Sequence, residues 1–186
     1  MEKIRYILFL IRFLPVGFAV NWNDTRLKED LERWKGIQHL QTGSLYVTAA
    51  VLLGMKKEFR NLFLYRNRNR MFFKRWAAIF YKPMESLFIE AEEIGGGLFI
   101  QHGFATMISA KTIGKNCWIN QQVTIGYRGN SPVPPVLGDS VTVTCGAKVL
   151  GNITLGDGCT IGANAVVIHD VEPGAVMAGV PARKIH

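Results

Sequence analysis

"GAKVLGNITLGDGCTIGANAVV", residues 146–167, places an aliphatic residue at every sixth position. Over the whole periodic region, the residues in this phase are Ile113, Ile119, Ile125, Leu137, Val143, Val149, Leu155, Ile161 and Val167. A period of six matches neither the 3.6 residues per turn of an α-helix nor the alternation of a long strand, but it suits very short strands with a turn in each repeat. Each aliphatic residue would point inward and stack on its counterpart in the next coil. The repeat therefore predicts a left-handed parallel β-helix, a solenoid of hexapeptide repeats.

The periodic pattern begins near Ile94, and the chain before it has a different character. We predict a helical N-terminal region at residues 1–83 and a β-helix domain at residues 84–186. Capping residues and helix breakers in the first region predict four helices. These are expected from residue 4 to about Pro15 and over about 24–36, 44–65 and 71–81.

The chain carries 22 Lys and Arg residues against 14 Asp and Glu, a net charge of +8. This excess suits an anionic partner. Because no basic stripe is interleaved with aromatics at a regular spacing, we expect no nucleic acid partner. An acidic membrane surface and a phosphate-rich cofactor both remain consistent with the sign of the charge.

The N-terminal segment "IRYILFLIRFLPVGFAV", residues 4–20, resembles a targeting segment only at first glance. Arg12 splits it, a membrane span needs about 20 apolar residues, and no small-x-small cleavage site follows. We expect a cytoplasmic protein whose first helix packs within the protein or against another subunit. The alternative is an interfacial helix with a basic face, in peripheral contact with the inner membrane face.

The three cysteines show neither the pairing of a zinc site nor that of a disulfide framework, so we expect reduced thiols and no metal. Cys117 and Cys159 fall four positions after an aliphatic anchor, in a small inward slot of the repeat. A thiol in such a slot acts as a compact hydrophobe. Cys145 falls on a turn, and no histidine accompanies any of the three in the repeat, which argues against a cysteine nucleophile.

The repeat is broken at two places, and departures from a regular scaffold are where chemistry is expected. The first is a slip near His102: Ile94 and Ile100 share one phase, whereas Met107 and Ile113 share another. An inserted residue there would distort a turn and direct a side chain out of the stack. The second is "GYRGNSPVPPV", residues 126–136, whose prolines and glycines predict a protruding loop.

Four stretches carry a resemblance to a known family. They are "IGGGLFIQH" (94–102), "INQQVTIG" (119–126), the opening stretch at 146–167 and "AGVPARKI" (178–185). The chain from Ile94 to Ile185 resembles the hexapeptide-repeat acyltransferases, and within them the serine acetyltransferase branch. The likeness extends weakly to "FRNLFLYR" (59–66) in the helical region.

The resemblance implies an enzyme that transfers acetyl from acetyl-CoA to a hydroxyl group, with His102 as the catalytic base. An alcohol is a weak nucleophile at neutral pH, and a histidine, whose ordinary pKa is about 6.5, can remove its proton during attack. The backbone amides of Gly126 and Tyr127 would face the oxyanion. The family's orienting aspartate aligns with Leu87, so Glu85 and Glu90 are the candidate substitutes for it.

The resemblance also implies that the coenzyme lies between neighbouring subunits of a homotrimer, or of a dimer of trimers. Gly146, Ala147 and Ala163 match small residues that let the pantetheine lie against the backbone. The family's phosphate-binding lysine is Thr160 here. The remaining candidates for the phosphate contacts are Lys148, Arg183 and Lys184.

The acceptor is where this chain departs from the serine acetyltransferases. That branch holds the serine carboxylate with an Arg-His pair, replaced here by Val133-Pro134, and with an aspartate of an Asp-Pro dipeptide that this sequence lacks. Arg128 is the candidate substitute, with Tyr127 as a wall of the acceptor pocket. We therefore expect an O-acetyltransferase for a sugar or glycan precursor, with serine as the alternative acceptor. A third interpretation is a solenoid that serves as a scaffold and catalyses no reaction.

Overall fold

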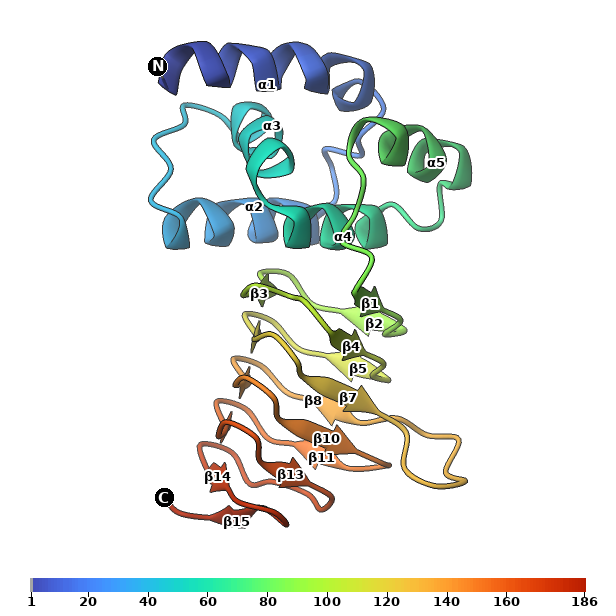
Figure 1. The fold of residues 1–186 in the computed structure, drawn as a ribbon, viewed down its shortest axis with the longest axis vertical. Helices are drawn as coiled ribbons and strands as arrows, with labels where there is room; N and C mark the ends of the chain where they lie inside the picture. The colour runs from blue at the N-terminus through green and yellow to red at the C-terminus, as the bar shows by residue number, and fades with distance from the viewer. Residues whose placement is uncertain (1) are drawn as a thin grey trace. The chain divides into compact units, whose positions relative to one another are not determined.

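The computed structural model describes residues 2–186, except for the side chains of Glu2, Lys3 and Phe72. The chain divides into two compact units, Met1–Met84 and Glu85–His186. The first unit is helical and the second is a β-solenoid (Figure 1). The helices are α1 (Glu2–Gly17), α2 (Thr25–Ile37), α3 (Leu45–Met55), α4 (Lys57–Arg66) and α5 (Met71–Phe80).

The helix boundaries follow the predicted caps and breakers except at two places. The first helix passes Pro15 and ends at Gly17, because a proline near the end of a helix removes only one late hydrogen bond. The single helix predicted over 44–65 was wrong. It is two helices, because Lys56 adopts an extended backbone with φ −117° and ψ 107° between them.

The helical unit has an aromatic core and one buried ion pair. The rings of Trp34 and Phe59 meet edge to face with centroids 5.2 Å apart. Arg66 on α4 donates two hydrogen bonds, 2.7 and 3.1 Å long, to the carboxylate of Asp30 on α2. The Asp30 side chain is 0% exposed and that of Arg66 2%, so this pair ties two helices together without contact with water.

The solenoid unit consists of three sheets, and each coil contributes to them in turn (Figure 1). The first sheet comprises β1 (Leu87–Ile89), β4 (Thr106–Ile108), β7 (Thr124–Gly126), β10 (Lys148–Leu150) and β13 (Val166–Val167). The second comprises β2 (Glu93–Ile94), β5 (Thr112–Ile113), β8 (Val136–Leu137) and β11 (Thr154–Leu155). The third comprises β3 (Phe99–Ile100), β6 (Trp118–Ile119), β9 (Thr142–Val143), β12 (Thr160–Ile161), β14 (Val176–Ala178) and β15 (Arg183–Lys184). All neighbours run parallel except β15, which is antiparallel to β14, and the predicted β-helix is confirmed.

The nine predicted aliphatic anchors form the core of the solenoid, and each is at most 2% exposed. They stack in register across coils, as Ile119 on Val143 and Val143 on Ile161 do in the third sheet. Full burial of a side chain of this size contributes about 1.5–3 kcal/mol. The ladder of anchors is therefore the main source of stability in this unit.

The register slip has a different form from the one predicted. Met107 is 40% exposed, whereas Ile108 is 0% exposed and pairs with Ile125, so Ile108 is the inward residue. The step from Ile100 to Ile108 thus spans eight residues instead of six, and the next step to Ile113 spans five. The chain inserts two residues between Ile100 and Met107, where six residues stand against the four between Ile119 and Thr124, and recovers one of them afterwards.

Cys117 and Cys159 fill the predicted inward slots and are fully buried, whereas Cys145 is half-buried. Burial raises the pKa of the Cys159 thiol to about 11, which keeps it protonated at neutral pH. All three cysteines are free thiols. Over residues 2–186, no helix combines the length and the apolar character that a membrane crossing requires.

Candidate functional site

The turns that lead from the third sheet into the first sheet form one edge of the solenoid, which we call the His102 edge. It comprises residues 101–105, 120–123, 144–147 and 162–165. Each of these turns contains at least one residue with a left-handed backbone: Ala105, Gln122, Gly146 and Asn164 occupy equivalent positions, with φ between 50° and 71°. The turns therefore stack directly on one another along the solenoid axis.

His102 lies in the longest of these turns. The two inserted residues force a bulge, and His102, Gly103 and Ala105 all take positive φ, at 65°, 59° and 50°. A left-handed conformation costs a residue with a side chain about 1–2 kcal/mol. The side chain of His102 is exposed, and no hydrogen bond or ion pair holds it among the described residues. The strained turn thus presents an imidazole to solvent.

Gln101, directly before His102, is fixed by the next coil. Its side-chain Oε1 accepts hydrogen bonds from Trp118 Nε1 at 3.1 Å and Asn120 Nδ2 at 3.4 Å. Its backbone N–H donates to the carbonyl of Ile119 at 2.8 Å. These contacts anchor one end of the bulge. We did not predict this trio from the sequence. The signal for it was that Gln101 and Asn120 are 19 residues apart, the same spacing as that of the stacked residues Ile100 and Ile119.

The two candidate orienting carboxylates lie at different edges of the first sheet. Glu85 precedes β1, and its neighbour Ser86 accepts a hydrogen bond from the amide of Thr106, which places Glu85 at the His102 edge. Glu90 follows β1 at the opposite end of the strand, where Ser109 Oγ donates to its Oε2 at 3.0 Å. Within one chain, therefore, only Glu85 shares an edge with His102.

The coenzyme candidates Gly146, Ala147 and Ala163 lie farther along the same His102 edge. Gly146 has φ +71°, and a Cβ at this position would collide with the side chain of Asn164. Ala147 is fully buried and Ala163 is exposed. The edge is consequently flat and free of large side chains at these coils, as an extended ligand lying on the backbone requires.

The three basic residues that are candidates for the phosphate contacts differ in the contacts that their side chains already make. Lys148 Nζ donates to the carbonyl of Gln122 at 2.7 Å, and Lys184 Nζ lies 2.6 Å from the carboxylate of Glu172. The hydrogen bond from Lys184 lowers the pKa of Glu172. Arg183 is exposed, and among the described residues it forms no ion pair. Arg183 is thus the candidate whose charge is available to a ligand.

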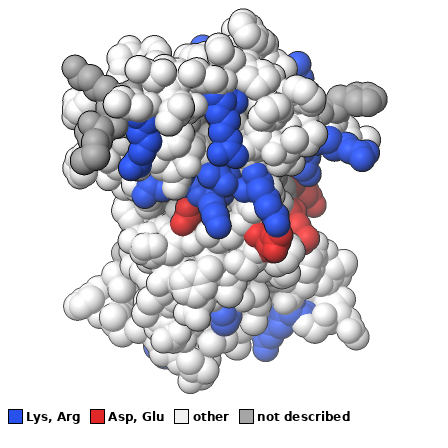
Figure 2. Space-filling view, turned by 45° about the horizontal axis from the view of Figure 1, so that its top comes forward, with Lys and Arg blue, Asp and Glu red and all other residues white. Residues whose placement is uncertain are grey.

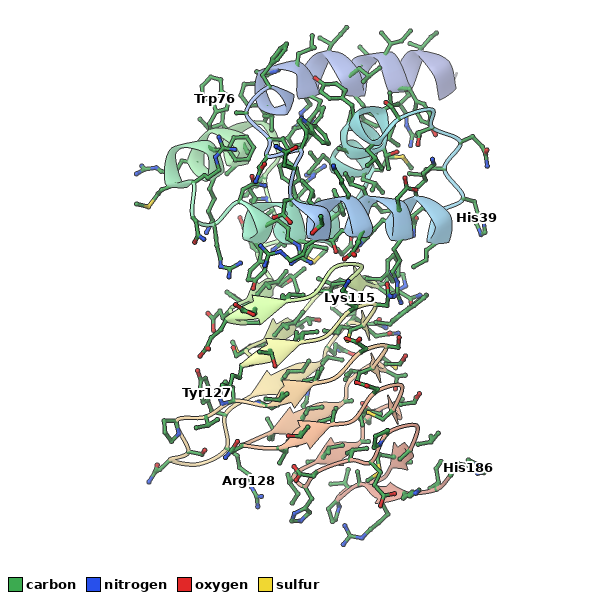
Figure 3. All side chains as sticks on the ribbon, turned by 180° about the vertical axis from the view of Figure 1, so that it is seen from behind. His39, Trp76, Lys115, Tyr127, Arg128 and His186 are labelled. Carbon is green, nitrogen blue, oxygen red and sulfur yellow. The ribbon has the colours of Figure 1, made fainter. Side chains whose placement is uncertain are left out.

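Gly126, Tyr127 and Arg128 lie at the other end of the first sheet. Gly126 ends β7, and its carbonyl accepts a hydrogen bond from the amide of Gly151 at 2.9 Å. Tyr127 is 54% exposed, and Arg128 packs over Gly151 at the base of the 127–135 loop (Figures 1 and 3). Three-residue strands of about 10 Å separate this loop from the His102 edge. A single chain therefore does not bring these residues to His102.

The described residues contain no group of three or more His, Cys, Asp or Glu side chains placed to hold a metal ion. The groups available at the His102 edge are an exposed imidazole, a carboxylate on the same edge and a backbone surface with small side chains. This combination suits proton transfer next to an extended ligand.

Comparison with known proteins gives a consistent result. Residues 134–169 match the model of the bacterial transferase hexapeptide family (six repeats). Serine acetyltransferase from Synechococcus elongatus is 42% identical over 96 residues, which are 50% of this chain and 39% of that protein. Serine acetyltransferase from Helicobacter pylori is 45% identical over 96 residues, 50% of this chain and 56% of that protein. The match thus spans about half the length of these curated relatives, or less.

A solved serine acetyltransferase in complex with CoA superposes on this fold with a TM-score of 0.64. It is 28% identical and covers 86% of this chain and 68% of its own. A segment of this chain, residues 134–169, therefore matches the bacterial transferase hexapeptide family, and the curated and structural neighbours named above are serine acetyltransferases.

Proposed function

We propose that this chain is an acyltransferase that moves an acetyl group from acetyl-CoA to a hydroxyl group, with His102 as the general base. The observation that carries this proposal is the exposed His102 on a strained turn, at the head of the flat edge that holds Gly146 and Ala147. The names of the relatives and the CoA complex of a structural neighbour support the same reaction class.

The chemistry follows from the geometry of this edge. The His102 imidazole takes the hydroxyl proton while the oxygen attacks the thioester carbonyl, which converts the carbonyl oxygen into an oxyanion. Collapse of the tetrahedral intermediate breaks the carbon–sulfur bond, and the imidazolium returns the proton to the departing sulfur. The amides of Gly126 and Tyr127 are suited to the oxyanion, with Glu85 as the partner that orients the imidazole.

Two copies of the chain are needed to assemble this site, because Tyr127 and His102 lie at opposite ends of the first sheet. In the arrangement that we propose, copies of the chain close around a threefold axis, and the loop of one copy meets the His102 edge of the next. The outer surface of the first sheet suits such a contact, since Phe88 and Met107 are paired neighbours there with 48% and 40% of their surface exposed. We therefore propose a homotrimer as the active form.

We propose serine as the first acceptor to consider, which reverses the order expected from the sequence. The relatives matched over about half of this chain are named serine acetyltransferases, and this favours serine over a sugar. The serine carboxylate needs a cation, and Arg128 is the one charged residue of the 127–135 loop. Its exposed position at the base of the loop suits a contact with the carboxylate.

A sugar hydroxyl remains the second candidate because of one observation. Pro134 is buried and Val133 half-buried in the loop, so the two positions that replace the Arg-His pair are apolar. A ring flanked by an aromatic and an apolar wall is a common way to hold a neutral polar ligand.

Acetyl-CoA is the co-substrate in this proposal, and no metal takes part. In this proposal the exposed Arg183 contacts its phosphates, and Lys148 and Lys184 are further cations once their present partners are exchanged. The free thiols of all three cysteines suit a reducing compartment such as the cytoplasm.

One assay tests the proposal. The protein is incubated with acetyl-CoA, and release of free thiol is followed with serine, homoserine, simple sugars and nucleotide-linked sugars as acceptors. We expect serine-dependent release, lowered by Arg128→Ala mainly through a higher KM. Turnover of a sugar alone would select the second candidate. No CoA binding in a calorimetric titration would overturn the enzyme proposal and leave a scaffold.

A further inference from the structure

The helical unit exposes an apolar surface that its own core does not use. On α1 and the turn that follows it, the exposed large apolar residues are Ile4, Ile7, Leu8, Ile11, Leu14 and Phe18, each between 46% and 85% exposed. Their spacing of three or four places them on one face of the helix. Phe13 and Val16, on the other face, are fully buried. α1 is thus apolar on both sides, and only one side is covered by this unit.

The second helix of this surface is α5. Met71, Trp76 and Ile79 are 70%, 47% and 73% exposed. The Trp76 indole donates to the carbonyl of Pro15 at 3.0 Å, and Arg12 donates to the carbonyl of Phe80. These bonds fix the two helices side by side, with Trp76 next to the end of α1 (Figure 3). We call the nine exposed apolar residues of the two helices the α1–α5 face.

A groove lies where the two helices meet. It has a volume of about 700 Å³ and is lined mainly by apolar groups, including Pro15, Phe73 and Trp76. Arg70 lines this groove and also a smaller polar pocket of about 200 Å³, where Arg26 and Arg66 are paired with Asp24 and Asp30. An apolar groove with an arginine at its border suits a molecule with a hydrocarbon chain and an anionic head.

The net positive charge of the chain comes entirely from the helical unit. Residues 1–84 contain sixteen Lys and Arg against six Asp and Glu, a net charge of +10, whereas residues 85–186 contain six against eight, a net charge of −2. Figure 2 shows Lys and Arg side chains gathered over the helical unit on the visible face. α5 contains no acidic residue, and Arg75 stands one helical turn from both Met71 and Ile79.

From these observations we propose that the helical unit docks on an anionic phospholipid bilayer through the α1–α5 face. The apolar side chains enter the boundary between headgroups and acyl chains, and the surrounding cations pair with lipid phosphates. Arg75 reaches the phosphates by extending its long side chain past Met71 and Ile79. α1 is 16 residues long, about 24 Å, which suits a helix that lies in the interface rather than one that crosses it.

A second copy of the chain is the main competing occupant of the α1–α5 face. Pairing two copies through it would bring together two units that each carry a net charge of +10. Like charges at this density oppose association, whereas an anionic membrane surface attracts them. Charge complementarity therefore favours the bilayer.

Vesicle flotation of the full-length protein tests the proposal. The vesicles contain phosphatidylcholine with about 30 mol% phosphatidylglycerol, or phosphatidylcholine alone, at about 0.05 and 0.5 M salt. We expect flotation with the anionic vesicles only, weakened several-fold at the higher salt. Trp76→Phe should remove most of the change in tryptophan fluorescence that vesicles cause, because Trp76 lies in the face.

A pair of variants with equal charge separates apolar insertion from simple attraction. Ile11→Glu/Phe18→Glu changes the α1–α5 face, whereas Gln41→Glu/Met55→Glu adds the same two charges to exposed positions outside it. The first should lower vesicle binding at least tenfold and the second less than threefold. Thermal melting followed by circular dichroism confirms that both variants fold.

Three outcomes would overturn the proposal: no flotation of the wild-type protein, equal losses in the two folded variants, or loss of a larger assembly in Ile11→Glu/Phe18→Glu by ultracentrifugation without vesicle binding. The last would assign the face to a second copy. None of these readouts depends on acetyl transfer, so they are independent of the proposed enzymatic function.

Discussion

Replacement of Arg66 by alanine should destabilise the helical unit far more than replacement of an arginine in an exposed ion pair would. The Arg66 guanidinium makes two hydrogen bonds to Asp30, and the two side chains are 2% and 0% exposed. Removal of Arg66 takes these two hydrogen bonds and their positive charge away from the buried Asp30 carboxylate. Breaking a buried ion pair in this way costs about 3–5 kcal/mol. We expect a loss of that size in the free energy of unfolding of the full chain, measured by urea titration.

Two further variants test the reasoning behind this number. Asp30→Leu/Arg66→Met removes both charges and fills a similar volume, so its stability should lie within about 2 kcal/mol of the wild type. Arg26→Ala removes the cation of the Asp24–Arg26 pair, 3.4 Å apart, whose arginine side chain is 49% exposed, and should cost less than about 1 kcal/mol. A loss below about 1 kcal/mol in Arg66→Ala, or equal losses in the single and double variants, would refute the argument from burial.

Three other predictions concern the solenoid. Gly114→Ala should lower the stability of the solenoid in thermal melts by about 1–3 kcal/mol, since a Cβ there would lie 2.5 Å from the carbonyl carbon of Gly138 in the next coil; an unchanged melting temperature would contradict this packing. In thiol labelling of the native protein at about pH 8, Cys145 should react and Cys159 should not, because Cys159 is buried with its pKa raised to about 11. Met107→Glu should break the proposed trimer in ultracentrifugation and lower acetyl transfer with it, because it charges the apolar surface of the first sheet; a trimer that persists would place the contact elsewhere.

The period of six was sufficient to predict the core of the solenoid, because each anchor can only point inward if the coils are to bury their aliphatic side chains. It could not decide between Met107 and Ile108, since both are apolar and the length of the preceding turn depends on which residues become left-handed. His102 and Ala105 take positive φ without being glycines, which no local pattern signals. The bulge was therefore located correctly near His102 and its length was not.

Strand pairing, rather than distance along the sequence, decides which candidate site residues lie at the same edge of the solenoid. Glu85 and Glu90 are equally plausible on the sequence, but three residues of β1 separate the edges on which they lie. The break between α3 and α4 was missed for a related reason. Lys56 is a good helix former with no glycine or proline beside it, so its extended backbone reflects tertiary packing rather than intrinsic preference.

The rate of acetyl transfer by His102→Ala, compared with its affinity for CoA, tests the central claim most directly. We predict that kcat falls by about 10² to 10⁴, the usual contribution of a general base, while the Kd for CoA measured by calorimetry stays unchanged. CoA affinity should persist because the imidazole acts on the hydroxyl and the coenzyme lies along the backbone of later coils. A His102→Ala variant with wild-type kcat would contradict the account.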